Sequence, residues 1–572
     1  MLGLSRDRDG KCGPQSSEWF NTCVQIDVCL FAINDSAMGH VFTDSPIFGV
    51  EQTSMRSLQL LNLAACLLLV GAVAGCPSSG KVTSGTTGGE ATAEDLLTSA
   101  VHQLRPENFS IAAASDKPVN LLNSWHLKGT NAAATVPPVT PPVGWVDESG
   151  AARLTATAYD DRDAVYIRDA MLNHSIAKYL AARAQDEVGQ IQAVFDFVVR
   201  NISLRGDDEP EIPLGLYELL LVGRGAPEDR AWICAKLLKQ LRIDSVIVRP
   251  MGAAENSEDW LLGVLLDSKT YLFDPRLGLA IPSTNDLAQA TIKPATLDEI
   301  ISHPEWLEQL TVRADQPYAI DVEGLKNPSI QPIVEFESWP ERMKDLEGAL
   351  PAEELCVLYD PLTDDADRAG FLSRLQKSLP SVTATELKPW TYPARQRAAM
   401  KIPNPAAAQA WAATTQIFRL PFPVNVNPAT GEQTIGAPEG RMLRIRIDQL
   451  LGKFDDANKR YLSIRHLEVE PVPDQDLVVL NRLGAEYAIY WSGVCKYEAQ
   501  EYDAAIEQLK TYVKRFDRNG RWAFAARTLL AECHAEQGHF GEAVAEVERV
   551  RSDDPNRVGN AIRVKRWNAR KK

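Results

Sequence analysis

The spacing of apolar residues predicts two successive helices between Tyr166 and Leu204. In the segment YIRDAMLNHSIAKYLAARA, apolar side chains recur every three to four residues, as on the buried face of a helix. The segment DEVGQIQAVFDFVVRNISL repeats this period, and its acidic start suits the positive end of a helix dipole. The predicted apolar faces carry Ile167, Met171, Ile176 and Leu180 in the first helix and Ile191, Val194, Phe195 and Val198 in the second.

A third helix and a set of strands are predicted after Gly223. In GRGAPEDRAWICAKLLKQL, the proline at 227 and the carboxylates after it are typical of a first helical turn, because proline lacks an N–H and the dipole favours negative charge there. SVIVRP then predicts a strand, WLLGVLLDSKTYLFDP a hairpin that turns at 267–269, and GLAIP a short extension. The helix face expected to be apolar carries Ala231, Cys234, Leu238 and Leu241.

The region 290–410 has a less regular pattern. ATLDEIISHPEWLEQL predicts a helix, and DDADRAGFLSRLQKSL predicts another. Between them, EELCVLYDP predicts a buried strand in which Cys356 is a core residue.

The C-terminal third contains an internal repeat. KYEAQEYDAAIEQLKTYVKRFDRN and AEQGHFGEAVAEVERVRSDDPN align at an offset of 38 residues, and an earlier unit, LLGKFDDANKRYLSIRH, matches them more weakly. A small residue at the helix crossing, an aromatic residue before it and a Gly/Gln turn resemble the tetratricopeptide repeat, whose usual period is about 34 residues. The resemblance implies stacked helical hairpins that bind a protein or peptide on a concave surface, although a purely structural array is the alternative. The aligned positions are Tyr502 with Phe540, Ala505 with Ala543, Cys495 with Cys533, and Gly452, Phe454 and Ala457 in the earlier unit.

Length and composition limit the class of protein. A chain of 572 residues is too long for one core and predicts two to four domains. The net charge of −16 argues against a nucleic-acid binder, because phosphate contacts need a positive face. Only the C-terminal KRWNARKK is basic, and a solvated end is expected for it. The nine cysteines show neither a CxxC pair nor metal-ligand spacing, so no metal, cofactor or disulfide framework is expected.

A targeting signal begins inside the chain at Met55. Arg56 is followed by an apolar run and by small residues before Cys76, as in MRSLQLLNLAACLLLVGAVAGC. Val73-Ala74-Gly75-Cys76 resembles the bacterial lipobox, in which the signal is cut before a cysteine that is then lipidated. An uncleaved membrane helix is the alternative, since the run is almost long enough to span. The absence of aspartate after Cys76 favours the outer over the inner membrane.

These patterns divide the chain into six segments. We expect translation to start at Met55, so that 1–54 is not part of the natural protein. The other segments are a signal peptide at 55–75, a lipid-anchored tether with a Pro-rich connector at 76–150, an α+β domain at 151–290, a mixed connecting region at 291–435 and helical repeats at 436–572.

The order of elements over roughly 160–285 resembles the transglutaminase-like core of the papain-type cysteine-enzyme fold. Phe195, Val198 and Ile202 match the end of its helix pair. Gly225, Asp229, Ala231 and the two leucines at 237 and 238 match its Gly-x-Cys-x-Asp-x-Ala helix. The stretch 241–244, Leu-Arg-Ile-Asp, stands for Leu-Gly-Ile-Pro, and 273–275 supplies the closing Asp-Pro. The fold class implied is α+β, a transglutaminase-like helix-plus-antiparallel-sheet domain followed by tetratricopeptide-like helices.

The catalytic residues of that family are missing here. By this resemblance the nucleophile position falls on Pro227, the general-base position on Asp259 (or Glu258 if the hairpin shifts by one), and the orienting carboxylate on Asp274. No cysteine lies between Cys76 and Cys234, and no histidine between His174 and His303. A thiol nucleophile needs a base within hydrogen-bond reach, so the pattern predicts a degenerate triad.

Two functions follow as expectations. The first is a non-catalytic, lipid-anchored binding or scaffold protein of the bacterial cell envelope, with a protein partner on the repeats. The alternative is a peptidase or transamidase with a rearranged thiol such as Cys234, although its place on an apolar helix face predicts a packed, inert side chain. His174 is expected at the surface or at a cap of its helix, and His303 in a loop before proline.

Overall fold

The helices and strands given below all belong to one compact unit, Ala93–Lys572. The predicted signal, Cys76 and the first part of the predicted tether, up to residue 90, lie outside the residues that the structure describes. The rest of the segment predicted as tether and connector is described except for 109–114 and 130–138, and it contains helices. The computed structural model describes residues 91–108, 115–129, 139–206, 209–254, 257, 259–289, 291–315, 317–380, 382, 387–402, 404–419, 423–426, 433–435, 442–465, 475–517, 519–549 and 552–571.

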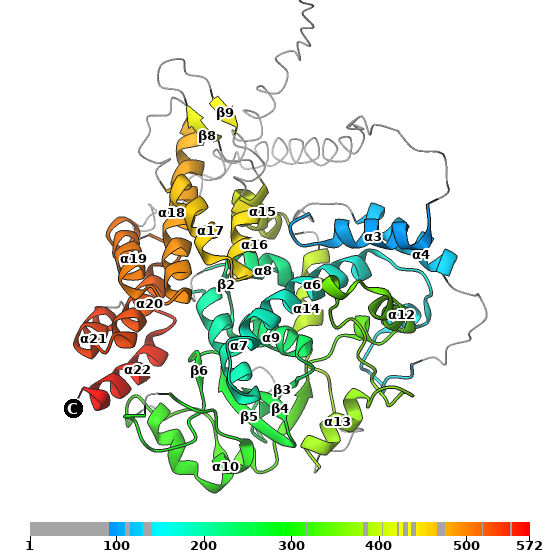
Figure 1. The fold of residues 1–572 in the computed structure, drawn as a ribbon. Helices are drawn as coiled ribbons and strands as arrows, with labels where there is room; N and C mark the ends of the chain where they lie inside the picture. Colours follow the sequence, from blue (N-terminus) through cyan, green and yellow to red (C-terminus); the bar gives the residue numbers. More distant parts are fainter. Residues whose placement is uncertain are drawn as a thin grey trace, which may run out of the picture. The chain divides into compact units, whose positions relative to one another are not determined.

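An antiparallel sheet of five strands, in the order β6-β5-β4-β3-β7, forms the main β part of this unit (Figure 1). Strands β4 and β5 form a hairpin in which Leu266 pairs with Lys269. Asp267 and Ser268 turn with φ of 49° and 62°, the left-handed backbone that a two-residue hairpin loop needs. The predicted strand, hairpin and extension are confirmed as β3 Asp244–Arg249, β4 Leu261–Leu266, β5 Lys269–Asp274 and β6 Leu279–Ala280, and β7 is Ser329–Pro332.

Both faces of this sheet are buried, each in a different hydrophobic core. Successive strand residues point to opposite faces, so Ile247 and Leu262 belong to one core and Val246 and Leu261 to the other. The first core also contains residues of the helices α7 (Glu187–Asn201) and α9 (Pro227–Gln240). The second contains residues of α10 (Leu297–Ser302) and α13 (Phe371–Ser378). Burial on both sides explains why these strands are apolar runs rather than alternating ones.

Helix α9 is buried on nearly all sides, whereas the sequence predicted a single apolar face. It packs against α6 (Asp161–Ala181), α7 and β3 (Figure 1). Its charged side chains find buried partners: the Lys236 ammonium and the Trp232 indole N–H both bind the Glu335 carboxylate. A buried charge is tolerated when it is paired, so polar residues could occupy a core position here.

Helices on the N-terminal side of α6 form a third core. Helix α3 (Ala93–Leu104) packs against α4 (Asp116–Gly129) and α6. Its buried residues Val101 and Leu104 share a core with Ile167 of α6. Helix α5 (Glu148–Thr155) begins at Asp147, whose side chain accepts a hydrogen bond from the Gly150 amide.

Two expectations for the middle region were wrong. The helix predicted from 295 ends at His303, because Pro304 supplies no N–H to continue it, and a 3-10 helix, Pro304–Leu310, follows α10. Cys356 is buried as expected, but its segment forms no strand. The Leu358 and Tyr359 amides donate to the Glu347 carboxylate instead of to a neighbouring strand.

Antiparallel helix pairs follow one another from Met442 to the C-terminal end, each packed on the next (Figure 1). The turns within the three pairs contain Gly452, Gln500 and Gly538, with φ of 79°, 62° and 77°. These turns are equivalent in the predicted alignment, so one left-handed residue ends the first helix of each pair. The helices are α16 Met442–Leu450, α17 Phe454–Ile464, α18 Gln475–Glu498, α19 Tyr502–Phe516, α20 Ala523–Glu536, α21 Phe540–Glu548 and α22 Arg557–Arg570.

The basic C-terminal segment is not a solvated end, which corrects the expectation from charge. It lies in α22, where Trp567 is buried and Lys565 donates to the Gln309 and Thr311 carbonyls. Gly559 of the same helix comes so close to the Leu277 carbonyl that a Cβ there would lie 2.3 Å from the oxygen. Lys565 therefore helps to hold the last helix on a loop near the sheet.

The remaining elements connect these parts. The short β1 and β2 pair in parallel, and β8 and β9 form a separate hairpin. Their bounds and those of the other helices are β1 Ser203–Leu204, α8 Leu216–Val222, β2 Arg224–Gly225, α11 Val322–Leu325, α12 Glu341–Ala349, α14 Tyr392–Lys401, α15 Pro405–Arg419, β8 Pro423–Val426 and β9 Gln433–Ile435. With helices in the majority and a small antiparallel sheet, the described unit is of the α+β class.

Candidate functional site

The first turn of α9 carries the predicted nucleophile position. Pro227 is its first residue, where the missing N–H costs nothing and the fixed φ suits a helix. The Asp229 carboxylate accepts a hydrogen bond from the Ala226 amide at 2.7 Å and thereby satisfies a donor at this helix end. Burial raises the pKa of Asp229 to about 6, although the Ala226 amide and the Tyr392 hydroxyl act in the opposite direction. The predicted nucleophile position is thus occupied by the proline ring of Pro227, which carries no thiol.

Asp274, the predicted orienting carboxylate, ends β5 and is completely buried. The Tyr318 hydroxyl donates to its Oδ2 at 2.7 Å, and the Arg276 guanidinium donates to the same oxygen at 3.0 Å. Its Oδ1 accepts from the Arg276 and Leu277 amides at 2.8 and 3.2 Å. Both oxygens are therefore occupied by local partners, as in a structural turn.

Asp259, the predicted base position, lies two residues before β4, and Glu258 lies outside the described residues. Because β4 and β5 are antiparallel, the start of β4 and the end of β5 meet at one end of the sheet. The Arg276 guanidinium reaches the Trp260 carbonyl at 3.4 Å there, and the Arg230 side chain of α9 donates to the Pro275 carbonyl at 2.9 Å. The structure thus brings the helix start and both carboxylate positions to the same end of the sheet.

Aromatic side chains cover this end of the sheet. Trp260 contacts Trp390 with ring centroids 6.3 Å apart, and Trp390 stacks on Tyr392 at 5.2 Å. The Tyr392 hydroxyl donates to Asp229 at 2.7 Å, and its ring meets Trp232 edge to face. All four rings are buried. The segment 387–392 therefore occupies the side of α9 next to its first turn.

The described cysteines are packed core residues. Cys234, Cys356, Cys495 and Cys533 are all free and buried, and we call them the four buried cysteines. Burial raises the pKa of the Cys234 thiol far above its usual value, and the Asp196 carboxylate acts in the same direction. The prediction that Cys234 is a packed residue is confirmed. Since the thiolate is the reactive form, Cys234 is not suited to nucleophilic catalysis.

The two histidines nearest in sequence to the candidate site do not serve it. His174 lies in the middle of α6, half-buried rather than at a cap, and burial lowers its pKa. His303 is exposed, as expected for a loop, and stacks on Trp306 with ring centroids 4.7 Å apart. No interaction found for either ring joins it to Cys234 or Asp274 among the described residues.

Four residues of this site were not anticipated from the sequence. Arg276 forms an ion pair with Asp274, and the Tyr318 hydroxyl donates a hydrogen bond to it. Trp390 and Tyr392 cover the helix start. Arg276 directly follows the Asp-Pro pair, which was a usable signal for a paired carboxylate. The aromatic pair belongs to a stretch without clear period, and Tyr318 lies 44 residues from its partner, so neither contact has a local signature.

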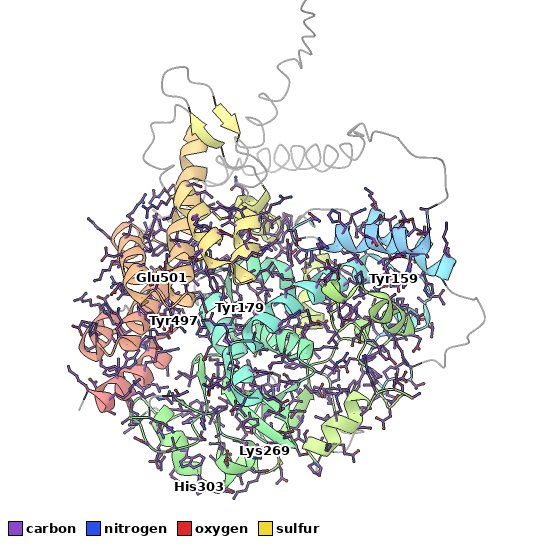
Figure 2. All side chains as sticks on the ribbon, viewed as in Figure 1. Tyr159, Tyr179, Lys269, His303, Tyr497 and Glu501 are labelled. Carbon is purple, nitrogen blue, oxygen red and sulfur yellow. The ribbon has the colours of Figure 1, made fainter. Side chains whose placement is uncertain are left out.

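The inner side of the C-terminal helix array faces the chain itself. The Arg200 guanidinium of α7 donates to the Glu498 carboxylate at 2.7 Å and lies over the Tyr497 ring. Tyr179 of α6, labelled in Figure 2, packs on Phe454 of α17 with ring centroids 5.8 Å apart. A small cavity of about 30 Å³ lies between α7, α9, α18, α20 and α22. Residues of α6 and α7 thus contact α17 and α18 on the side of the array that faces them.

No metal or membrane-spanning feature emerges from the described part of the chain. No three of its His, Cys, Asp and Glu side chains are grouped as metal ligands would be. None of its helices combines the length and apolarity needed to cross a bilayer. The predicted lipidation residue, Cys76, lies outside that part.

Comparison of the chain with protein-family models, with curated proteins and with solved structures gives no match in any of the three.

Proposed function

We propose that this chain is a non-catalytic, transglutaminase-like lipoprotein of the bacterial cell envelope that holds a protein partner through its C-terminal helices. The observation that carries the proposal is the content of the three triad positions, Pro227, Asp259 and Asp274. None of these side chains can act as a thiol or an imidazole. The aromatic cover on the first turn of α9 and the burial of Cys234 support the same conclusion.

The α+β architecture supports the resemblance in order and direction of elements. A helix pair, a buried helix and an antiparallel hairpin follow one another, and the start of α9 lies at the end of the sheet where β5 ends. Arg242 has a φ of 59° at the position of the glycine in the Leu-Gly-Ile-Pro motif. Glycine adopts a left-handed backbone more readily than other residues, so this φ agrees with the glycine of the motif.

A thiol-reactive activity probe tests the loss of catalysis. We expect no stoichiometric labelling of the folded protein at Cys234, because the thiol is buried and lacks a base. Labelling at Cys234 that disappears on heat unfolding would support the alternative, a peptidase or transamidase with a rearranged nucleophile.

The lipid anchor is tested by metabolic labelling with palmitate. We expect the wild-type chain to take up label and to fractionate with the outer membrane, and we expect Cys76→Ala to do neither. Label on the Cys76→Ala chain would refute the anchor and leave open an uncleaved membrane segment.

We propose that the partner binds the exposed side of α19, since α6 and α7 already contact α17 and α18. Glu507, Lys510 and Lys514 are exposed there. Reversing their charges should abolish co-purification of a specific partner from solubilised envelopes while leaving the circular dichroism unchanged. Reversal of Lys269, exposed on the β4–β5 turn, is the matched control (Figure 2). Deletion of 440–572 is unsuitable, because these helices share a core with α7 and α9.

Light scattering of the same variants separates partner binding from self-association. If the array only joins copies of the chain, charge reversal on α19 will change the molar mass in solution, and no second protein will co-purify. The proposal requires that the molar mass stays unchanged and that a second protein co-purifies with the wild type.

A further inference from the structure

A charged cavity lies at the end of α9 opposite to the aromatic cover. Its volume is about 220 Å³, compared with roughly 30 Å³ for one water molecule in the liquid. It is lined by the last turn of α9, the turn into β3, the segment 357–369 and α13. Its charged lining residues are Lys239, Arg242, Asp244, Asp360, Arg368 and Arg374.

Positive charge is in excess at the mouth of this cavity. Arg242 and Arg368 both donate to the same oxygen of Glu347, at 2.9 and 2.6 Å. The other oxygen of Glu347 accepts from the Leu358 and Tyr359 amides at 2.8 Å each. Two guanidinium groups therefore share one carboxylate, and both oxygens of that carboxylate already accept two hydrogen bonds each. Their side chains are 48% and 35% exposed, so a solute can reach them.

The floor of the cavity has paired charges that are largely buried. Arg374 binds Asp244 with two hydrogen bonds of 2.7 and 2.9 Å and also binds Asp360 at 2.9 Å. The Lys239 ammonium lies 3.5 Å from Asp360 and donates to the Ser338 hydroxyl at 2.9 Å. Burial lowers the pKa of Lys239 even though Asp360 acts in the opposite direction. Negative charge from a ligand would favour the protonated form of this amine.

Arg242 is held in an unfavourable backbone conformation. Its φ is 59°, and it follows the end of α9 where the Ile243 amide turns back to the Leu238 carbonyl at 3.1 Å. This position after a helix is normally glycine, because other L-residues are strained there. Nothing in the backbone path requires a side chain, so the reason for an arginine lies in what its guanidinium contacts.

We propose that this cavity binds a small anion carrying a carboxylate or phosphate group, which Arg242 and Arg368 grip at the mouth. Planar guanidinium groups bind both kinds of oxyanion through paired hydrogen bonds. The ligand replaces part of the shared contact with Glu347, and the body of the ligand occupies the cavity above Lys239 and Arg374. The site is separate from the candidate site at the start of α9 and does not depend on the proposed scaffold function.

Isothermal titration calorimetry of the full chain tests this inference. Inorganic phosphate and acetate are titrated in separate arms into detergent-solubilised protein, at an ionic strength held constant with sodium chloride. We expect saturable binding in at least one arm, and the tighter arm identifies the phosphate or carboxylate class. Arg242→Gly should weaken that binding by about tenfold or more, since a charged hydrogen-bonding group is lost.

Two controls make the result decisive. Arg242→Gly should unfold at the same or a higher urea concentration than wild type, because glycine relieves the left-handed strain. Arg313→Ala removes an exposed arginine paired with Asp315 outside the cavity and should leave binding unchanged. The inference is overturned if neither anion binds saturably, if Arg242→Gly binds as the wild type does, or if Arg313→Ala weakens binding equally.

Discussion

The junction between the sheet-bearing part and the C-terminal helices can be tested at one glycine. Gly223 ends α8 with a φ of 70°, and an added Cβ would lie 2.4 Å from the Trp491 ring of α18 and 3.0 Å from the Asn201 carbonyl. The Arg446 guanidinium lies over the ring of Trp491, with its central carbon 3.5 Å from the ring centroid. Arg446 is itself fixed by the Leu220 carbonyl. Trp491 is fully buried and also contacts the Tyr490 and Trp522 rings, so a shift of the indole would disturb close packing.

The cost of Gly223→Ala has two parts. A non-glycine residue in the left-handed region costs about 1 to 2 kcal/mol. Overpacking a closed core adds about 1 to 3 kcal/mol, because the tryptophan or the backbone must shift. We therefore expect a loss of about 2 to 5 kcal/mol in the free energy of unfolding. Gly252→Ala is the matched control, with a φ of 86° and no atom within 4 Å of the added Cβ, and only the first cost applies to it.

Urea unfolding followed by tryptophan fluorescence measures both variants against wild type. The reasoning predicts a clearly larger fall in midpoint for Gly223→Ala than for Gly252→Ala, at similar slopes. Equal falls would show that Trp491 does not press on Gly223, and the packing of α18 on α8 described above would then be wrong.

Three further outcomes are expected. Tyr392→Phe removes the hydroxyl that donates to Asp229 and should lower the free energy of unfolding by about 1 kcal/mol in urea titrations; an unchanged midpoint would contradict the contact. Asp229 has its pKa raised to about 6, above its value of about 3.9 in the unfolded chain, so its contribution to stability is lost as pH rises from about 4 to 6. Asp229→Asn should make the free energy of unfolding fall less over this pH range. Some fall should remain, because burial also raises the pKa of Asp169 to about 6. An unchanged curve would exclude a raised pKa for Asp229. The four buried cysteines should resist Ellman's reagent in the native protein and react in urea, with peptide mass spectrometry identifying each one; rapid native labelling of any of them would contradict its burial.

Local sequence signals were sufficient to predict elements whose ends are set by residues within the element itself. Pro227 and Asp229 mark the start of α9, and Asp267 and Ser268 allow the left-handed turn that sets the β4–β5 register. Aligned aromatic and small residues located the helix pairs after Met442, because each hairpin repeats the same crossing. The positions of Asp259 and Asp274 at one end of the sheet also follow from a hairpin whose turn lies between them.

Contacts over long sequence distances were beyond such signals. The cover of Trp390 and Tyr392 on the start of α9 joins residues 163 apart, and neither segment indicates the other. The segment around Cys356 has the composition of a strand, yet Glu347 takes its amide hydrogens. Charge alone suggested a solvated C-terminal end, whereas backbone carbonyls near the sheet accept its Lys565.

The docking of α22 makes the C-terminal end of the helix array a fixed attachment rather than a loose one. Ile562 of this helix is buried in the same core as the far face of the sheet. The helix array is thus joined to both cores that flank the sheet, through α18 in one core and through α22 in the other. Loss of the fourteen-residue α22 would remove the second of these attachments.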